Sequence, residues 1–198
     1  MDFSKTFAIV TGSSSGIGKH ICEQLLLDYP NLKVLGLDIS QTNITNNSNF
    51  YWIKCDLGDA MSIQTCFHEI KQNHAVDDSG NKIHCSIVIN NAGINKPIPI
   101  LADEKLSTPT SLKLTPDSVY KTNILEDFRI YQKNLDVNVV GYMMVTRLGA
   151  QLMNHESSGN IINICSLLGH KIYPIPTVHP YQIAKFGVRA LTEATRSS

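Results

Sequence analysis

Short apolar runs alternate along this chain with stretches in which apolar residues recur at helical spacing. The runs predict β-strands at 7–11, 33–38, 50–54, 85–90 and 161–164, and the helical spacing predicts helices at 17–28, 60–73, 128–152 and 181–195. Strands that are apolar throughout and separated by helices form a parallel sheet covered on both faces. Because crossovers between parallel strands are right-handed, we expect an α/β fold with a doubly wound parallel sheet, the Rossmann fold.

The composition is that of an ordinary globular protein of one domain. The 198 residues are 42% hydrophobic and 17% charged, and the formal net charge is zero. This balance indicates neither a nucleic-acid partner nor an acidic membrane, and no run approaches the roughly 18 apolar residues of a membrane span. The five cysteines form no C-x-x-C pair and no signal peptide precedes the first strand, so we expect reduced thiols in the cytoplasm.

A glycine-rich segment, T-G-S-S-S-G-I-G at 11–18, separates the first predicted strand from the first predicted helix. Such a loop lets backbone N–H groups approach a pyrophosphate, and the helix N-terminus favours negative charge. Its position favours a nucleotide site over an ordinary turn. We therefore expect a single Rossmann-type NAD(P)-binding domain over residues 1–198. Its cofactor contacts would come from Gly12, Ser14, Ser15, Gly16, Ile17 and Gly18.

Two carboxylates follow the next predicted strands. Asp38 ends the second strand about twenty residues after the glycine loop, where a carboxylate accepts hydrogen bonds from the ribose of adenosine. A 2′-phosphate would meet like charge there, and Ile39 and Ser40 bring no cation, so NAD is favoured over NADP. The alternative for Asp38 is a solvated turn residue. Asp56 and Leu57, after the third strand, would flank the adenine.

A serine, a tyrosine and a lysine form the candidate catalytic group. Tyr181 and Lys185 are four residues apart in a predicted helix and therefore share one face, and Ser166 follows the fifth predicted strand. Hydride transfer at an alcohol carbon needs proton movement at its oxygen, for which a free tyrosine has too high a pKa. We expect Lys185 to lower the pKa of Tyr181, Tyr181 to act as acid and base, and Ser166 to position the substrate oxygen.

The chain resembles the classical short-chain dehydrogenases/reductases in T-G-S-S-S-G-I-G, Asp56-Leu57, N-N-A-G at 90–93, L-D-V-N-V around Asn138, Ser166 and Y-Q-I-A-K. The resemblance implies an NAD(P)-dependent oxidoreductase acting on CH–OH groups. It places Asn90, Ala92 and Gly93 at the cofactor, together with Tyr181 and Lys185, and implies that Asn138 supports a water relay to the lysine. It also implies a homodimer or homotetramer in a full-length form, built on the helices at 128–152 and 181–195.

Two segments, I-I-N-I-C-S-L-L-G-H-K and V-H-P-Y-Q-I-A-K-F-G-V-R-A-L-T-E, resemble the branch with insect farnesol dehydrogenase and animal 3-keto and 17β-hydroxysteroid reductases. Members of that branch often prefer NADP, which Asp38 opposes, so NADP is the second choice of cofactor. Family members continue beyond the point that matches Ser198. We therefore expect a truncated form, in which the helix face of Phe186, Val188 and Leu191 lacks partners.

Residues 94–127 do not fit the alternation of strands and helices. This stretch holds four prolines, many Ser and Thr residues and little periodicity. We interpret it as an insertion, which is either a lid over the site or a surface excursion. The substrate is not readable from the sequence, although Tyr173, Pro174, Ile175 and Pro176 suggest an apolar wall that suits a lipid, steroid or terpenoid alcohol.

Two functions stay open from the sequence. The first is hydride transfer between NAD(P) and a secondary alcohol or ketone, with an NADP-linked carbonyl reductase as a variant. The second is a catalytically weak or inactive isoform that keeps nucleotide binding or a regulatory, dimerising role. His170 and His179 would contact substrate or satisfy loop hydrogen bonds. No metal is expected, because the seven histidines are scattered and no cluster has ligand spacing.

Overall fold

The computed structural model describes residues 5–41, 44, 47–77, 79–98, 124–153, 159–175 and 177–196. The chain forms two compact units, which are described in turn. Unit 1 comprises Met1–Gly93 and Val140–Ile164, and unit 2 comprises Ile94–Val139 and Cys165–Ser198. Of the predicted insertion at 94–127, residues 99–123 lie outside the described residues.

Unit 1 contains a five-stranded sheet in the order β3-β2-β1-β4-β5, and every pair of neighbouring strands is parallel. The strands are β1 (Thr6–Thr11), β2 (Lys33–Asp38), β3 (Phe50–Lys54), β4 (His84–Asn90) and β5 (Asn160–Asn163). The order reverses direction at β1, which is the arrangement of the Rossmann fold. The predicted fold is therefore confirmed, and each strand lies within a residue or so of its predicted position.

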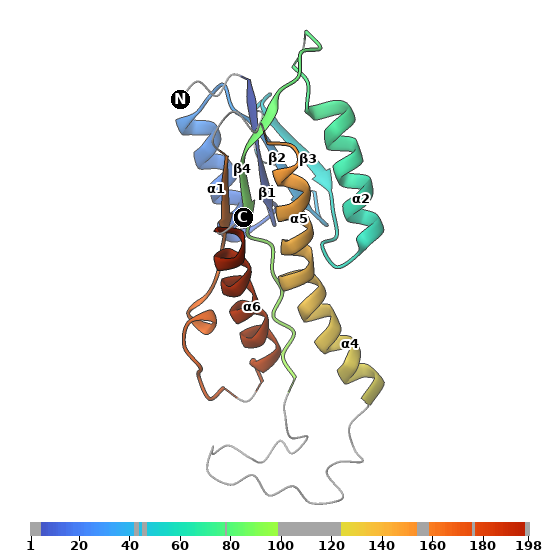
Figure 1. Ribbon diagram of the computed structural model, residues 1–198, viewed down its shortest axis with the longest axis vertical. Coiled ribbons are helices and arrows are strands. Elements are labelled where there is room, and N and C mark those ends of the chain that lie inside the picture. The colour runs from blue at the N-terminus through green and yellow to red at the C-terminus, as the bar shows by residue number, and fades with distance from the viewer. Residues whose placement is uncertain are drawn as a thin grey trace, which may run out of the picture. The chain divides into compact units, whose positions relative to one another are not determined.

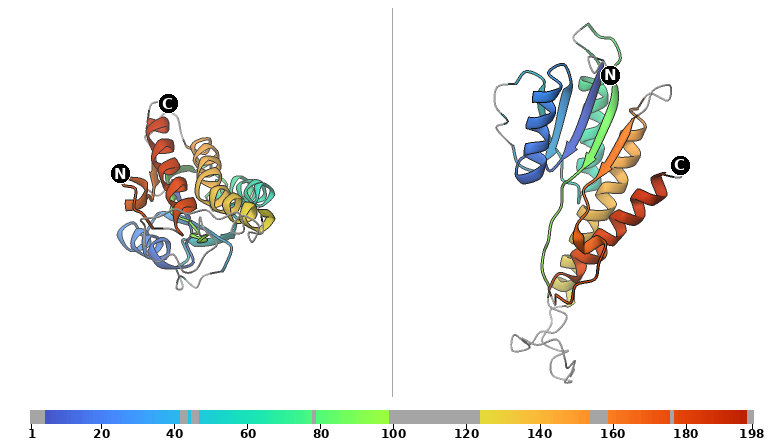
Figure 2. Two further views of the ribbon diagram at one scale, coloured as in Figure 1. Left: turned by 90° about the horizontal axis from the view of Figure 1, so that it is seen from below. Right: turned by 90° about the vertical axis from the view of Figure 1, so that its left-hand side faces the viewer.

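Helices cover both faces of this sheet. Helix α1 (Gly16–Asp28) lies on one face, and α2 (Ala60–Glu69) and α5 (Gly141–Ala150) lie on the other (Figures 1 and 2). Cys22 and Leu26 of α1 pack with Ala8, Val10 and Val34 of the sheet in one buried cluster. The central strands are apolar on both sides because both faces are covered. The edge strand β5 is less enclosed, and its Ile162 is 46% exposed.

Unit 2 is built mainly of helices. It contains α4 (Ile124–Leu135), most of the π-helical turn η2 (Asp136–Val140), the short 3-10 turn η3 (Leu167–Gly169) and α6 (His179–Arg196). Within this unit, α6 contacts both α4 and η3. Val188 of α6 is fully buried, so the expectation that it lacks partners is wrong.

The long helix predicted at 128–152 is present, but its bounds differ and a π turn divides it into α4 and α5. Helical structure begins at Ile124, passes through the π turn η2 and ends at Ala150. A π turn holds one extra residue, which changes the direction of every side chain that follows, and periodicity alone does not locate it. This turn contains Asn138, which the resemblance assigns to the site.

Candidate active site

The glycine loop of unit 1 bends sharply and packs against the end of β4. Gly12 has a φ of +69°, and a Cβ on it would lie 2.8 Å from the Cα of Ala92. A Cβ on Gly18 would lie 2.1 Å from the carbonyl oxygen of Gly12. Any larger residue at position 18 would therefore displace the loop, and only glycine gives α1 this close start.

Hydrogen bonds tie the glycine loop to the N-N-A-G segment. The Thr11 hydroxyl oxygen accepts from the backbone N–H of Asn91 at 2.9 Å and of Ala92 at 3.0 Å. The Asn91 side chain donates to the carbonyl oxygens of Thr11 at 3.0 Å and Gly12 at 3.3 Å. The sequence analysis did not assign Thr11 or Asn91 a role. The signal was present, since both follow neighbouring parallel strands, whose carboxyl ends share one edge.

Asp38 lies at the end of β2 and bonds to the same loop. Its carboxylate accepts from the backbone N–H of Ser14 at 3.0 Å and from that of Ser40 at 3.0 Å. The Ser14 hydroxyl donates to the carbonyl oxygen of Ser40. Asp38 is half-buried, and its negative charge is thus held beside the loop that the sequence assigns to the cofactor.

Asp56 and Leu57 follow β3, and Asn90 is the last residue of β4, but the three side chains differ in how exposed they are. The Asp56 carboxylate accepts from the N–H of Gly58 at 2.8 Å, and Leu57 is 6% exposed. Asn90 is fully buried and donates to the Thr146 hydroxyl at 2.9 Å and the Asn163 side chain at 2.8 Å. The Asn90 side chain therefore joins strand to helix, and a contact with the adenosine ribose would have to use its backbone.

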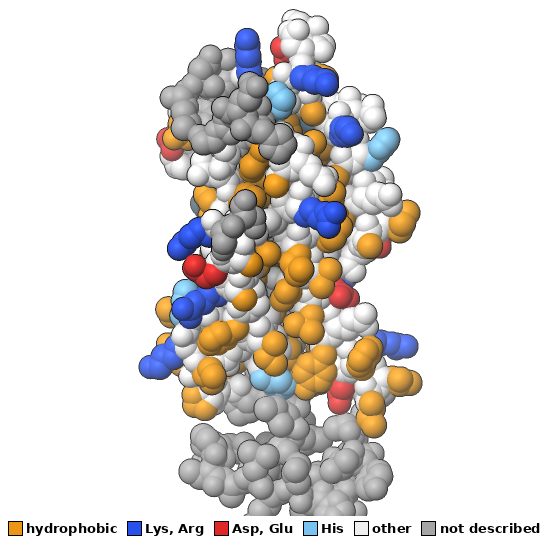
Figure 3. All heavy atoms as spheres, in the orientation of Figure 1, with side chains coloured by type: hydrophobic (Ala, Val, Ile, Leu, Met, Phe, Trp, Pro, Cys, Tyr) orange, Lys and Arg blue, Asp and Glu red, His pale blue; other side chains and the backbone are white. Residues whose placement is uncertain are grey.

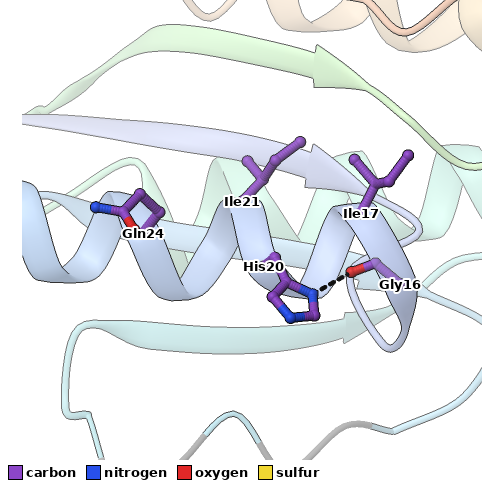
Figure 4. Close-up of a pocket in the computed structure, with 5 residues that line it drawn as sticks. All are labelled: Gly16, Ile17, His20, Ile21 and Gln24. Carbon is purple, nitrogen blue, oxygen red and sulfur yellow. Dashed lines mark hydrogen bonds between the residues drawn. The ribbon is translucent and has the colours of Figure 1, made fainter.

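A shallow hollow lies over the first turns of α1 and is lined by Gly16, Ile17, His20, Ile21 and Gln24 (Figure 4). The His20 ring lies 2.8 Å from the carbonyl oxygen of Gly16, and Ile17 and Ile21 point to another side of the helix. Neither Ser14 nor Asp38 lines this hollow. The hollow shares only Gly16 and Ile17 with the predicted cofactor loop, and we do not assign it to the nucleotide.

Unit 2 brings Ser166, Tyr181 and Lys185 together. Ser166 starts η3, where its hydroxyl oxygen accepts from the N–H of Leu168 at 3.2 Å, and the same hydroxyl hydrogen-bonds to the phenol of Tyr181. The Lys185 ammonium lies 5.6 Å from the centre of the Tyr181 ring, and Lys185 is only 3% exposed. The helical spacing thus places both side chains on one face, as the sequence predicted.

Burial controls the titration of this pair. Desolvation lowers the pKa of Lys185 below 10.5, while charge on Cys165 acts in the other direction. Desolvation also raises the pKa of Tyr181 above 10, and the hydrogen bond from Ser166 offsets it only in part. The sequence predicted a lowered tyrosine pKa, and this structure gives the opposite direction, because burial of the phenol raises the pKa more than the hydrogen bond to Ser166 lowers it.

Asn138 is fully buried in the π turn η2, and both the oxygen and the NH₂ group of its side chain bond to one residue. Its carbonyl oxygen accepts from the N–H of Ile94 at 3.0 Å, and its NH₂ group donates to the Ile94 carbonyl at 2.8 Å. A water relay through this residue would therefore have to use the backbone of the π turn. Asn134, one turn earlier, makes a similar pair with Lys96, which the sequence analysis did not find.

The two loop histidines differ. His170 is exposed, whereas His179 starts α6 and lies 2.8 Å from the Tyr131 hydroxyl through its Nε2 atom. His179 thus makes a hydrogen bond within unit 2, as the alternative interpretation expected. Among the described residues, no group of three or more His, Cys, Asp or Glu side chains is arranged to hold a metal ion. No helix in the described ranges is both long and apolar enough to cross a membrane.

Comparison with known proteins identifies the family. The model of the short chain dehydrogenase family matches residues 6–198, so the chain belongs to this family. It is 30% identical to dehydrogenase/reductase SDR family member 11 of Gallus gallus over 96% of this chain and 66% of the relative. It is 25% identical to farnesol dehydrogenase of Aedes aegypti over 96% of this chain and 69% of the relative. The chain thus spans about two thirds of these relatives, and the resemblance seen in its motifs is confirmed.

Solved structures show the same fold. A short-chain dehydrogenase/reductase from Burkholderia vietnamiensis matches with a TM-score of 0.72 and 19% identity, over 98% of this chain and 80% of that one. The ligand-free aldohexose dehydrogenase of Thermoplasma acidophilum matches with a TM-score of 0.71 and 22% identity, over 98% and 61% of the two chains.

Proposed function

We propose that this protein is an NAD(P)-dependent oxidoreductase that transfers a hydride between the nicotinamide and a secondary alcohol or ketone. The observation that carries the proposal is the group of Ser166, Tyr181 and the buried Lys185 on adjacent elements of one unit. Relatives named as a dehydrogenase/reductase, a farnesol dehydrogenase and a diacetyl reductase support this class of reaction.

The residues of unit 1 fit a dinucleotide. A loop closed by Gly12 and Gly18, with no room for a Cβ at either, leaves its backbone free to meet a pyrophosphate at the start of α1. Ser14, Ser15, Gly16 and Ile17 complete that contact, and Asp38 would accept from the adenosine ribose. Asp56 and Leu57 would flank the adenine, and the backbone of Asn90, Ala92 and Gly93 would line the ribose side. When bound, the nicotinamide supplies or accepts the hydride.

We expect NAD to bind in preference to NADP. The Asp38 carboxylate is held in place by two backbone N–H groups, and none of the described hydrogen bonds brings a Lys or Arg side chain to it. A 2′-phosphate would add like charge beside this group. NADP is the second choice, since the charge of one half-buried carboxylate is partly screened by solvent.

Tyr181 would move the proton at the substrate oxygen. Its raised pKa keeps the phenol protonated near neutral pH, which suits donation to a ketone oxygen during reduction. Ser166 would hydrogen-bond to the same oxygen and hold it near the phenol. Lys185 would bind the nicotinamide ribose, and its charge would favour the phenolate in the reverse reaction. Asn138 would support proton supply through the backbone of the π turn.

An apolar substrate fits the segment that follows Ser166. Leu167 is 74% exposed, Ile172 is 75% exposed and Ile175 is 46% exposed, so three large apolar side chains stand open in one short segment. Pro176, which the sequence adds to this apolar wall, lies outside the described residues. A lipid, steroid or terpenoid secondary alcohol would cover such a surface.

A homodimer or homotetramer would use the outer faces of α4 and α6. Ile124, Leu125 and Phe128 of α4 and Ile183 of α6 are each more than half exposed, and hydrophobic side chains gather over these helices (Figure 3). Large exposed apolar patches of this kind mark interaction surfaces. The five free cysteines support a location in the reducing cytoplasm.

The proposal is tested by titrating the chain with NADH and with NADPH, followed by turnover with a panel of secondary alcohols and ketones. We expect tighter binding of NADH and measurable hydride transfer with an apolar alcohol. If the chain binds NADH or NADPH but transfers no hydride with any member of the panel, the proposed activity would be contradicted. A nucleotide-binding, regulatory role would then be favoured. Tighter binding of NADPH than of NADH would contradict only the role of Asp38 in selecting the cofactor, and not the proposed reaction.

A further inference from the structure

Two asparagines on one face of the helical run α4–η2 hold the backbone of an extended segment, residues 94–98, named here the strap. The Asn138 side chain pairs with the backbone N–H and C=O of Ile94 at 3.0 and 2.8 Å. The Asn134 side chain pairs with the N–H and C=O of Lys96 at 3.3 and 3.0 Å. Both asparagines are fully buried, whereas Ile94 is half-buried and Lys96 is exposed, so the four bonds are partly buried.

The spacing of the two pairs explains why they form together. Four residues of a helix rise about 6 Å, and two residues of an extended chain span about 6.6 Å, so side chains at i and i+4 meet alternate residues of the strap. Each amide side chain supplies one donor and one acceptor, as a neighbouring strand would. Asn134 also donates to the carbonyl of Ile130, which fixes its orientation.

The far end of the strap reaches the segment that leads into α6. The N–H of Ile98 donates to the carbonyl of Thr177 at 3.1 Å, and Ile98 is only 4% exposed. Thr177 lies two residues before α6 begins and four residues before Tyr181. The strap thus runs from the π turn to the start of the catalytic helix along α4 (Figure 1).

We propose that Asn134 is a positioning residue that fixes the middle of the strap and thereby sets the affinity for the alcohol or ketone. This inference rests on the proposed function. Asn138 holds the first residue of the strap, directly after the predicted cofactor ligand Gly93, whereas Asn134 holds Lys96, nearer the end that joins the approach to Tyr181. Loss of Asn134 therefore loosens the substrate end of the strap and leaves the cofactor end in place.

The test uses the full chain with Asn134→Ala, and with Gln132→Ala as control, since Gln132 is exposed on the same helix. For Asn134→Ala we expect a rise in KM for the alcohol of about tenfold, because the N–H and C=O of Lys96 lose the two hydrogen bonds that hold the strap in place. The Kd for NADH should change less than about twofold and the pH profile should not move, since the titrating groups are untouched. Gln132→Ala should change none of these quantities.

Amide hydrogen exchange, followed residue by residue by NMR, gives a readout that needs no turnover. In the wild-type chain the amides of Ile94, Lys96 and Ile98 should exchange slowly and that of Asn95 quickly, and Asn134→Ala should accelerate Lys96 by at least about tenfold. Fast exchange at Lys96 in the wild-type chain would overturn the strap itself.

The positioning role would be overturned if Asn134→Ala accelerates exchange at Lys96 but leaves KM unchanged. It would also be overturned if KM for the alcohol and Kd for NADH rise together. Nicotinamide binding by the wild-type chain without any turnover would contradict the proposed function, and with it the kinetic role of Asn134. The exchange pattern would then still decide whether Asn134 holds the strap. If Asn134→Ala does not fold, Asn134→Ser, which keeps a hydroxyl, serves in the same measurements.

Discussion

The glycine loop of unit 1 and the helix α6 of unit 2 make their contacts in different ways. The loop relies on backbone atoms, because Gly12 and Gly18 leave no room for a Cβ and Asp38 is held by backbone N–H groups. The helix α6 relies on two side chains, a half-buried phenol and a buried ammonium. The glycine loop should therefore lose its binding function when a substitution adds atoms to a glycine. The helix α6 should lose its function when a substitution removes atoms from Tyr181 or Lys185.

Tyr181→Phe should give the largest effect on catalysis. The substitution removes the only atom of Tyr181 that can move a proton and keeps the ring in place. We expect kcat to fall by about 10²- to 10⁴-fold, as for the loss of a general acid. Steady-state kinetics with the best alcohol of the panel measures this, and a kcat within a few-fold of wild type would show that another group moves the proton.

Gly18→Ala should be the strongest perturbation of the nucleotide loop. A Cβ at 2.1 Å from the Gly12 carbonyl oxygen forces the loop to move, at a cost to the free energy of unfolding of about 1–3 kcal/mol. The Kd for NADH should rise at least about tenfold, because the backbone N–H groups of the loop lose their alignment with the pyrophosphate.

Gly16→Ala is the matched control for the steric claim. Its Cβ would meet no atom within 4 Å, although its φ of +50° is unfavourable for alanine. Nicotinamide fluorescence and thermal unfolding should therefore show a smaller loss than Gly18→Ala. An equal loss in both variants would show that backbone conformation, and not close approach, limits the loop.

Asp38→Asn should sharpen the comparison by removing the negative charge from the loop. The amide keeps an oxygen for the N–H of Ser14 and removes the negative charge, but its NH₂ group cannot accept from the N–H of Ser40. We expect the ratio of NADPH to NADH affinity to rise by about tenfold, from the loss of like-charge repulsion near a partly exposed site. Competitive titration measures the ratio. An unchanged ratio would show that Asp38 does not select the cofactor and would favour the alternative that it is a solvated turn residue.

Lys185→Met should weaken NADH binding through loss of the proposed ribose contact, and its smaller effect should be a pH-dependent change in stability. Since burial lowers the pKa of Lys185 in the folded state, the folded chain binds fewer protons than the unfolded chain between that pKa and 10.5. The resulting destabilisation is full below the folded pKa and disappears as the pH rises toward 10.5. Lys185→Met should therefore raise the melting temperature at neutral pH, and the gain should shrink at alkaline pH. A gain that is constant with pH would exclude the desolvated charge as its cause.

The sheet could be predicted well from the sequence because each strand is marked by residues that are close together in the chain. Apolar runs bounded by Asp38, Asp56 and Asn90 mark strands whose ends share one edge, and the structure confirms their parallel order. Glycines and short motifs likewise located the loop before α1 and the pair on α6.

The contacts that the sequence did not predict depend on distant partners. Asn134 pairs with Lys96, and Asn91 with Thr11, and no periodicity links such residues. The π turn at 136–140 was missed because one extra residue leaves the apolar pattern almost unchanged. The direction of the Tyr181 pKa was predicted from its neighbour alone, whereas burial, a property of the whole fold, decides it.

The central claim is that the glycine loop of unit 1 supplies most of the affinity for the dinucleotide, whereas Tyr181 of unit 2 moves the proton. The most direct test is an NADH titration of Tyr181→Phe beside a turnover assay of the same sample. The account predicts a Kd within about tenfold of wild type, the most that one neutral hydrogen bond contributes, together with loss of turnover. Turnover that persists, or NADH binding that disappears with it, would contradict the account.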